Sequence, residues 1–163
     1  MLKKDFWDLV KVFVWRELKI KYAQTYLGIF WMLFPPLMAL LVVSFFFGNL
    51  MKVSHEIPNY TLFAYVGMLS WFYFSYVVSF SSVSLLQNQE IVQKSPIPRI
   101  IFPLAKAICG IMDLLIWYLL AFILMLFFDL KPGFTFLLLP FILVLNFIAG
   151  FSIGIWIAAF SIR

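Results

Sequence analysis

Apolar residues in this chain gather in four long runs, separated by shorter polar segments. The runs cover approximately residues 27–50, 61–85, 103–128 and 135–160. A helix that crosses a hydrocarbon layer of about 30 Å needs about 20 residues at 1.5 Å per residue, and each run supplies that many. The pattern therefore predicts four transmembrane helices, which together form a transmembrane domain over residues 27–163.

Residues 1–26 follow a helical period instead of a continuous apolar run. The charged positions on one side of the predicted helix are Lys4, Asp8, Lys11 and Lys19, and the apolar positions on the other side are Phe6, Leu9, Val10, Phe13, Val14 and Ile20. This pattern favours a cytoplasmic amphipathic helix in the headgroup layer, and it suits equally a helix that docks a cytoplasmic partner. Glu17 falls within the apolar arc. We therefore expect either that the helix lifts from the membrane there or that Glu17 meets a basic partner.

Composition agrees with a membrane protein. The chain is 65% hydrophobic and 12% charged, whereas soluble domains are about 25% charged. A soluble chain of 163 residues could not bury so much apolar surface without lipid. We therefore expect an all-α membrane protein. The chain has a single cysteine, Cys109, and no pair of Cys or His residues at metal-site spacing, so we expect no bound metal.

Lysine and arginine are concentrated on one side of the predicted membrane. Most of them lie in the N-terminal segment and in the connection between the second and third runs, whereas the other two connections contain only Lys52 and Lys131. Because positively charged loops tend to stay in the cytoplasm, both termini are predicted to be cytoplasmic. An even number of spans agrees with this orientation.

Prolines interrupt two segments. Pro35 and Pro36 lie well inside the first run, where they remove backbone donors and bend a helix. Such a bend is typical of a helix packed in a bundle or beside a cavity, and a plain kink fits equally well. Between the second and third runs, further prolines predict a short helix over residues 85–94, a rigid turn, and a new helix that begins near Pro103.

Asp113 is the one acid well inside a predicted span, where a charge is costly and signals function by default. It could form a contact across a subunit interface, belong to an inward-facing polar patch on a conduit, carry protons, or be a neutral, hydrogen-bonded structural acid. Lys106, on the same helix face, is expected to extend toward the cytoplasmic surface. The spans offer Asp113 no second acid or Ser/His pair, and no Gly-rich phosphate loop occurs, so we expect a protein that is not an enzyme.

Aromatic residues are abundant, most densely in the second run. Belts at the membrane interface and lipid-facing positions account for most of them. The polarised faces of aromatic rings also stack on sugar C–H groups. A path for a sliding hydrophilic polymer is therefore a second interpretation, and its candidate lining residues are Trp31, Trp71, Tyr73 and Tyr76.

Two separated blocks of sequence resemble a known family. The first block reads Arg16-Glu-Leu-Lys-Ile-Lys-Tyr22, then Thr25-Tyr-Leu-Gly28, Trp31 and Pro35, and the second reads Asn88, Ile91-Val-Gln-Lys94, Ile97-Pro98-Arg99 and Pro103-Leu104. Gly67, Trp71 and Asp113 fit the same pattern. These residues resemble the ABC-2-type permeases, in particular the membrane subunits of exporters for O-antigen, capsular polysaccharide and teichoic acid.

The resemblance implies a half-transporter that forms a homodimer, pairs with cytoplasmic ABC ATPase subunits and exports a lipid-linked polysaccharide across the bacterial cytoplasmic membrane. ATP and Mg would be bound by the partner ATPase, so this chain itself would need no cofactor. By the same likeness, residues 5–24 form an interface helix and residues 85–99 a coupling segment. The residues implied in ATPase coupling are Arg16, Glu17, Lys94, Pro98 and Arg99. Members of the family usually continue through two further spans. The chain therefore resembles the N-terminal part of a six-span protein, as a fragment or truncated product or as a shortened form.

Other functions fit the same observations. An ABC-2 permease for a drug or a lipid shares every feature except the cargo. A four-span membrane enzyme acting on lipid-linked sugars would use Asp113. A scaffold would recruit partners through its basic face.

Overall fold

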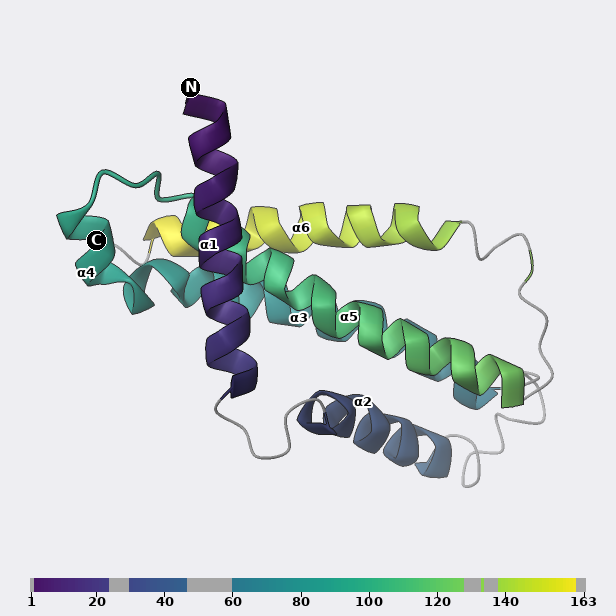
Figure 1. Ribbon diagram of the computed structural model, residues 1–163. Helices are drawn as coiled ribbons and strands as arrows, with labels where there is room; N and C mark the ends of the chain where they lie inside the picture. Colours follow the sequence, from purple (N-terminus) through teal and green to yellow (C-terminus); the bar gives the residue numbers. More distant parts are fainter. Residues whose placement is uncertain (1, 24–29, 47–59, 128–132, 134–137, 161–163) are drawn as a thin grey trace.

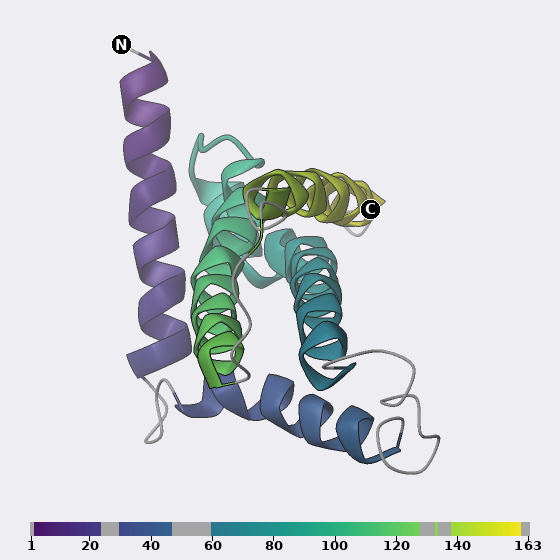
Figure 2. The ribbon, with the colours of Figure 1, turned by 90° about the vertical axis from the view of Figure 1, so that its right-hand side faces the viewer.

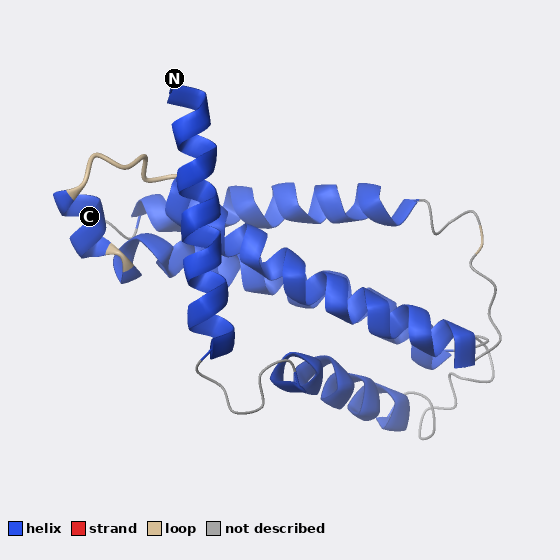
Figure 3. Cartoon of the chain, in the orientation of Figure 1, coloured by secondary structure: helices blue, strands red, loops and turns tan. Residues whose placement is uncertain are grey.

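The computed structural model describes residues 2–23, 30–46, 60–127, 133 and 138–160. Every regular element in these ranges is a helix (Figures 1 and 3). In chain order the helices are α1 (Leu2–Ala23), α2 (Phe30–Val43), α3 (Tyr60–Gln87), α4 (Gln89–Lys94), α5 (Ile101–Phe127) and α6 (Leu139–Phe160). The all-α class expected from the apolar runs is confirmed for this part of the chain.

Three of the helices are long and apolar enough to cross a membrane, namely α3, α5 and α6. They correspond to the second, third and fourth predicted spans, so the chain is a multi-pass membrane protein. The first predicted span is represented by the shorter α2, which has 14 residues and overlaps a short apolar helical stretch, Leu33–Phe46. The remainder of residues 27–50 lies outside the described ranges. The cytoplasmic placement of both termini stays a prediction.

Helix α3 is central, because it packs against α2, α4, α5 and α6. Successive helices α2, α3, α5 and α6 run in alternating directions (Figure 1). Helix α1 instead crosses the bundle transversely and lies against α5, as both ribbon views show (Figures 1 and 2). The crossing lies toward the end of the bundle that also carries α4 and the C-terminal end of α6.

Small residues bring α6 close to α3. Gly150, Gly154 and Ala158 follow one another at intervals of one helical turn and are all buried. A Cβ added at Gly154 would lie 2.7 Å from the Cβ of Ser81 on α3, which is closer than real Cβ atoms approach. One turn before Gly150, Asn146 Nδ2 donates a hydrogen bond of 3.1 Å to the backbone oxygen of Ser70. Without side chains in the way, the two backbones gain van der Waals contact, which holds helices together in lipid.

The contact between α3 and α5 is made by larger side chains. Tyr65, Leu69, Tyr73 and Val77 of α3 form a buried cluster with Ala107, Leu114, Trp117 and Ala121 of α5. The buried hydroxyl groups of Tyr65 and Tyr73 each donate to a backbone oxygen of α5, at 3.4 Å. Hydroxyl groups need such partners in an apolar interior, so these bonds complete the packing.

The proline segments form helices and a turn. Helix α2 continues through Pro35 and Pro36, so the two residues do not end the helix. The short helix expected over residues 85–94 is divided, because α3 extends to Gln87 and α4 covers Gln89–Lys94. An irregular turn follows, and α5 begins at Ile101, two residues before the expected position at Pro103.

Candidate functional site

The contact between α1 and α5 begins with an apolar cluster. Val10 and Phe13 of α1 are buried against Phe102 and Ala105 of α5, and the rings of Phe13 and Phe102 meet edge to face at a centroid distance of 5.0 Å. The predicted apolar face of α1 is therefore used to pack on protein. Ile20, which was assigned to that face, is instead half exposed, because the buried stripe continues through Glu17 and Lys21.

Glu17 lies in the buried stripe and is paired. Its Oε2 accepts a bond of 2.5 Å from Lys106 Nζ on α5, and its Oε1 accepts one of 3.2 Å from Arg16. Of the two outcomes expected for Glu17, the basic partner is the one present. Lys106 is expected to extend toward the cytoplasmic surface, and in the structure its side chain, 14% exposed, ends at Glu17 of α1. An acid buried in protein needs such a counter-charge.

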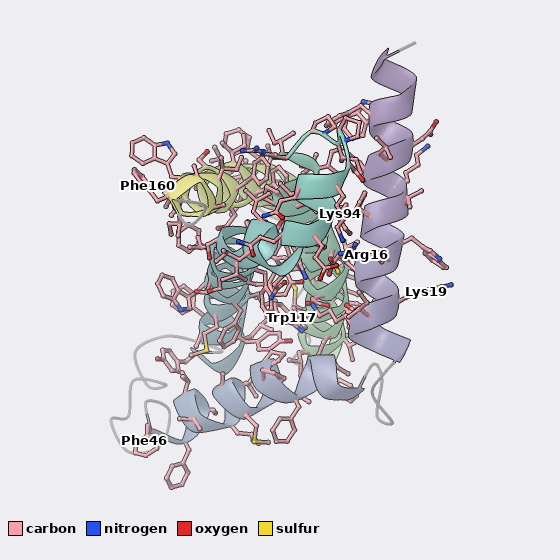
Figure 4. The ribbon with its side chains drawn as sticks, turned by 90° about the vertical axis from the view of Figure 1, so that its left-hand side faces the viewer. Arg16, Lys19, Phe46, Lys94, Trp117 and Phe160 are labelled. Atoms are coloured by element: carbon pink, nitrogen blue, oxygen red, sulfur yellow. The ribbon has the colours of Figure 1, made fainter. Side chains whose placement is uncertain are left out.

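Arg16 connects α1 to the junction between α3 and α4. Its guanidinium donates to Oδ1 of Asn88, the buried residue that separates the two helices, and Asn88 Nδ2 in turn donates to the backbone oxygen of Ser84 at 2.7 Å. Figure 4 shows Arg16 pointing from α1 toward the rest of the molecule, whereas Lys19 points away from it. The basic side chains of α1 are thus divided, because Arg16 points inward and Lys19 outward.

Asp113, near the middle of α5, is an ion-pair partner of α1. It accepts hydrogen bonds from Lys21 Nζ and from the hydroxyl group of Tyr22. Lys21 Nζ also lies 4.2 Å from the ring centroid of Tyr76 on α3, a cation–π contact. Burial and the hydrogen bond to Asp113 raise the pKa of Tyr22, so its hydroxyl group stays a donor. None of the four roles weighed for Asp113 included a partner from the N-terminal helix.

The other residues implied in ATPase coupling are at the surface. Lys94 ends α4, and Pro98 and Arg99 lie in the turn before α5, where all three are exposed. In the end-on view of Figure 4, Lys94 lies on α4 at the face turned toward the viewer. Arg99 also lines an open groove of about 370 Å³ between the ends of α3 and α6 and the start of α5. Glu17, by contrast, is buried, with 7% of its surface exposed, and is held in its ion pairs.

The proposed aromatic lining residues do not share one face. Trp71 is 65% exposed on α3, whereas Tyr73 is 1% exposed within the α3–α5 core. Tyr76 is partly buried beside Lys21, and the side chain of Trp31 lies outside the described residues. Trp71, Tyr73 and Tyr76 therefore do not form a continuous surface within a single chain. Within the described ranges, no group of three or more His, Cys, Asp or Glu side chains could hold a metal ion.

The sequence is similar to known membrane transport proteins. The pattern that defines the ABC-2 type transporter family matches residues 8–162. Two Klebsiella pneumoniae proteins named O-antigen export system permease protein RfbA are 33% identical over 99 residues, which is 61% of this chain and 38% of theirs. A Myxococcus xanthus protein of the same name is 29% identical over 98 residues, or 60% of this chain and 37% of its own.

The chain spans less than two fifths of the length of these curated relatives. The family match, in contrast, covers nearly the whole chain, from the first half of α1 to beyond the last described turn of α6. It includes both ion pairs between α1 and α5 and the three candidate spans. This protein therefore belongs to the ABC-2 type transporter family, as a membrane permease domain and a transport subunit rather than an enzyme.

Proposed function

We propose that this protein is the membrane subunit of an exporter that carries a lipid-linked polysaccharide outward across the bacterial cytoplasmic membrane. A separate ABC ATPase subunit supplies the energy, and two copies of the permease form the conduit. In this proposal both termini, α1, α4 and the turn before α5 face the cytoplasm, where the ATPase binds. ATP and Mg are bound by that partner.

The observation that carries the proposal is the similarity to O-antigen export permeases over about three fifths of the chain. The geometry supports it at the end of the bundle that carries α4. Lys94, Pro98 and Arg99 are exposed there, and α1 crosses the bundle toward the same end (Figure 1). A cationic, proline-stiffened surface beside a transverse helix suits a partner with acidic groups in a cleft.

The test is to purify the protein gently from its own membrane and to measure the composition of the complex by native mass spectrometry. We expect two permease chains with two ATPase subunits. The variant Arg99→Glu should insert normally, lose most of the bound ATPase and abolish export, because it places a negative charge at the proposed contact. Lys11→Glu makes the same charge change at an exposed position of α1, so a comparison of the two variants shows whether the turn or α1 carries the contact.

Two results would contradict the proposal. A homo-oligomer without any ATPase, under conditions that preserve other membrane complexes, would remove the energy source. Normal ATPase binding and export in Arg99→Glu would exclude the turn as the contact. The cargo is tested separately with the exposed Trp71, whose replacement by leucine should reduce polysaccharide export without changing ATPase binding. An equal loss for unrelated lipids would favour a lipid or drug permease.

A further inference from the structure

Two ion pairs between α1 and α5 have opposite polarity. Along α1 the charges are negative at Glu17 and positive at Lys21, and along α5 they are positive at Lys106 and negative at Asp113. Glu17 and Lys21 are one helical turn apart and Lys106 and Asp113 two turns apart, so each set lies on one face of its helix. The two faces meet where α1 crosses α5.

Apolar packing alone does not select one position for α1. The apolar side chains of an amphipathic helix recur every three or four residues, so a displacement by one turn brings similar side chains into the same contact. The charges do not repeat in this way. A displacement of α1 by four residues places Lys21 opposite Lys106, and a reversal of the helix places Glu17 opposite Asp113. Both alternatives bring like charges together.

Burial makes these mismatches costly. The side chains of Glu17, Lys106 and Asp113 are largely removed from solvent, so an unmatched charge cannot be screened by water. Asp113 lies well inside an apolar helix long enough to span a membrane, where a charge without a partner is especially unfavourable. The pairing is therefore specific in sign as well as in position.

We propose that Glu17, Lys21, Lys106 and Asp113 form a charge clamp that sets the register and direction in which α1 crosses α5. All four act as positioning residues. In the clamped register Arg16 reaches Asn88, so the clamp also sets the position of α1 relative to the α3–α4 junction. A role of the clamp in transmitting motion from the ATPase to the permease rests on the proposed function, because that role requires the ATPase to bind at α4. The position of α1 on α5 does not depend on the proposed function.

Cross-linking measures the register without reference to any cargo. Phe13 and Phe102 are in ring contact across the α1–α5 crossing, and both are replaced by cysteine in a protein whose own cysteine, Cys109, is replaced by alanine. In isolated membranes a short bifunctional thiol reagent should link the two positions. This parent should cross-link efficiently, and failure to do so would contradict the crossing itself.

Charge reversal then tests the clamp. In that parent, Glu17→Lys and Lys106→Glu should each lower the cross-linking yield by about tenfold, because like charges meet in the contact. The double variant should restore the yield to within about threefold of the parent, since the pair is re-formed with its signs exchanged. Lys21→Glu and Asp113→Lys should likewise each lower the yield, and their combination should restore it.

A net-charge control separates pairing from total charge. Combining Glu17→Lys with Lys21→Glu leaves the charge of α1 unchanged but mismatches both pairs, so it should lower the yield more than either single change. Lys11→Glu, at an exposed position, should leave the yield at the parent level. Unchanged cross-linking in the single variants, or double variants no better than the singles, would overturn the proposal.

A functional readout distinguishes the clamp from the permease proposal. With Phe13, Phe102 and Cys109 all native, the ratio of export to ATP hydrolysis should fall in the single reversals and recover in the doubles. If cross-linking recovers in the double variants but the wild-type protein binds no ATPase and exports nothing, the clamp is sustained and the proposed function is refuted. Normal export in single variants that no longer cross-link would refute the transmission role of the clamp.

Discussion

Two helix contacts in this protein hold their partners in different ways. At the α3–α6 contact, Gly150, Gly154 and Ala158 bring the helices together through the absence of side chains. At the α1–α5 contact, two charged pairs of opposite polarity follow the Phe13–Phe102 ring contact along both helices. The first contact is selective for shape and the second for sign. The α3–α6 contact, which we call the shape contact, tolerates no added side-chain volume. The α1–α5 contact, which we call the sign contact, tolerates a charge reversal on one helix when the partner charge on the other helix is reversed as well.

The largest expected effect concerns the sign contact, at Lys21. Its replacement by methionine keeps most of the stem but leaves Asp113, whose side chain is 6% exposed, without its cation. Breaking a buried pair in this way typically costs about 3–5 kcal/mol, and we expect the lower end because the site is partly exposed. The free energy of unfolding in mixed micelles measures it.

Asp113→Asn is the matched comparison for Lys21. The lysine left behind is 29% exposed and can turn toward water, so this variant should lose clearly less stability than Lys21→Met. An equal or larger loss of stability in Asp113→Asn would show that leaving Lys21 without its anion costs at least as much as leaving Asp113 without its cation.

Gly154→Leu tests the shape contact. Even the first added carbon would approach Ser81 Cβ to 2.7 Å, so α6 must move away from α3. Overpacking of this kind typically costs about 1–3 kcal/mol of unfolding free energy. Gly67→Leu on α3 is the control, because nothing lies within 4 Å of a Cβ added there. Similar losses in both variants would point to helix propensity or insertion instead of packing.

Asn146 sharpens the comparison by adding one polar bond to the shape contact. Asn146→Leu removes the hydrogen bond to the Ser70 backbone oxygen. Hydrogen bonds between membrane helices are worth about 0.6 kcal/mol on average, so the loss should be well below that of Gly154→Leu. A loss that exceeded the glycine variant would mean that the amide, and not the small-residue stripe, holds α6.

The smallest effect is expected for a charged pair outside the contact. Lys11 and Asp8 lie 3.7 Å apart on the outer side of α1, and both side chains are mostly exposed. Lys11→Ala should change the unfolding free energy by less than about 0.5 kcal/mol, and added salt should remove the difference. A large effect would show that this face of α1 is covered by a partner.

The elements were predictable where the signal is local. The second, third and fourth apolar runs became α3, α5 and α6, with ends within a few residues of those expected where the ends are described, because run length and hydropathy depend only on neighbouring residues. The prolines were harder to interpret. Pro35 and Pro36 lie inside a continuous α2, since a helix can continue past proline where neighbouring groups or local adjustments satisfy the freed backbone.

The site was only partly predictable. Glu17 was recognisable as a misplaced acid that required a basic partner, and Asp113 as a costly charge within a span. Their partners were not recognisable, because Lys106 and Lys21 are 89 and 92 residues away in the sequence. The aromatic residues of α3 gave no signal that Trp71 faces outward and Tyr73 inward, since apolar and aromatic residues surround the whole helix.

The sequence by itself determined the class of protein, the long apolar helices and the presence of two buried acids that needed explanation. These follow from composition and from periodicity along the chain, which short-range geometry translates directly into helices. Only the tertiary structure decided which charges meet. The transverse crossing of α1 over α5 brings the two ends of each ion pair together, and no local pattern specifies that crossing because it depends on how whole helices pack.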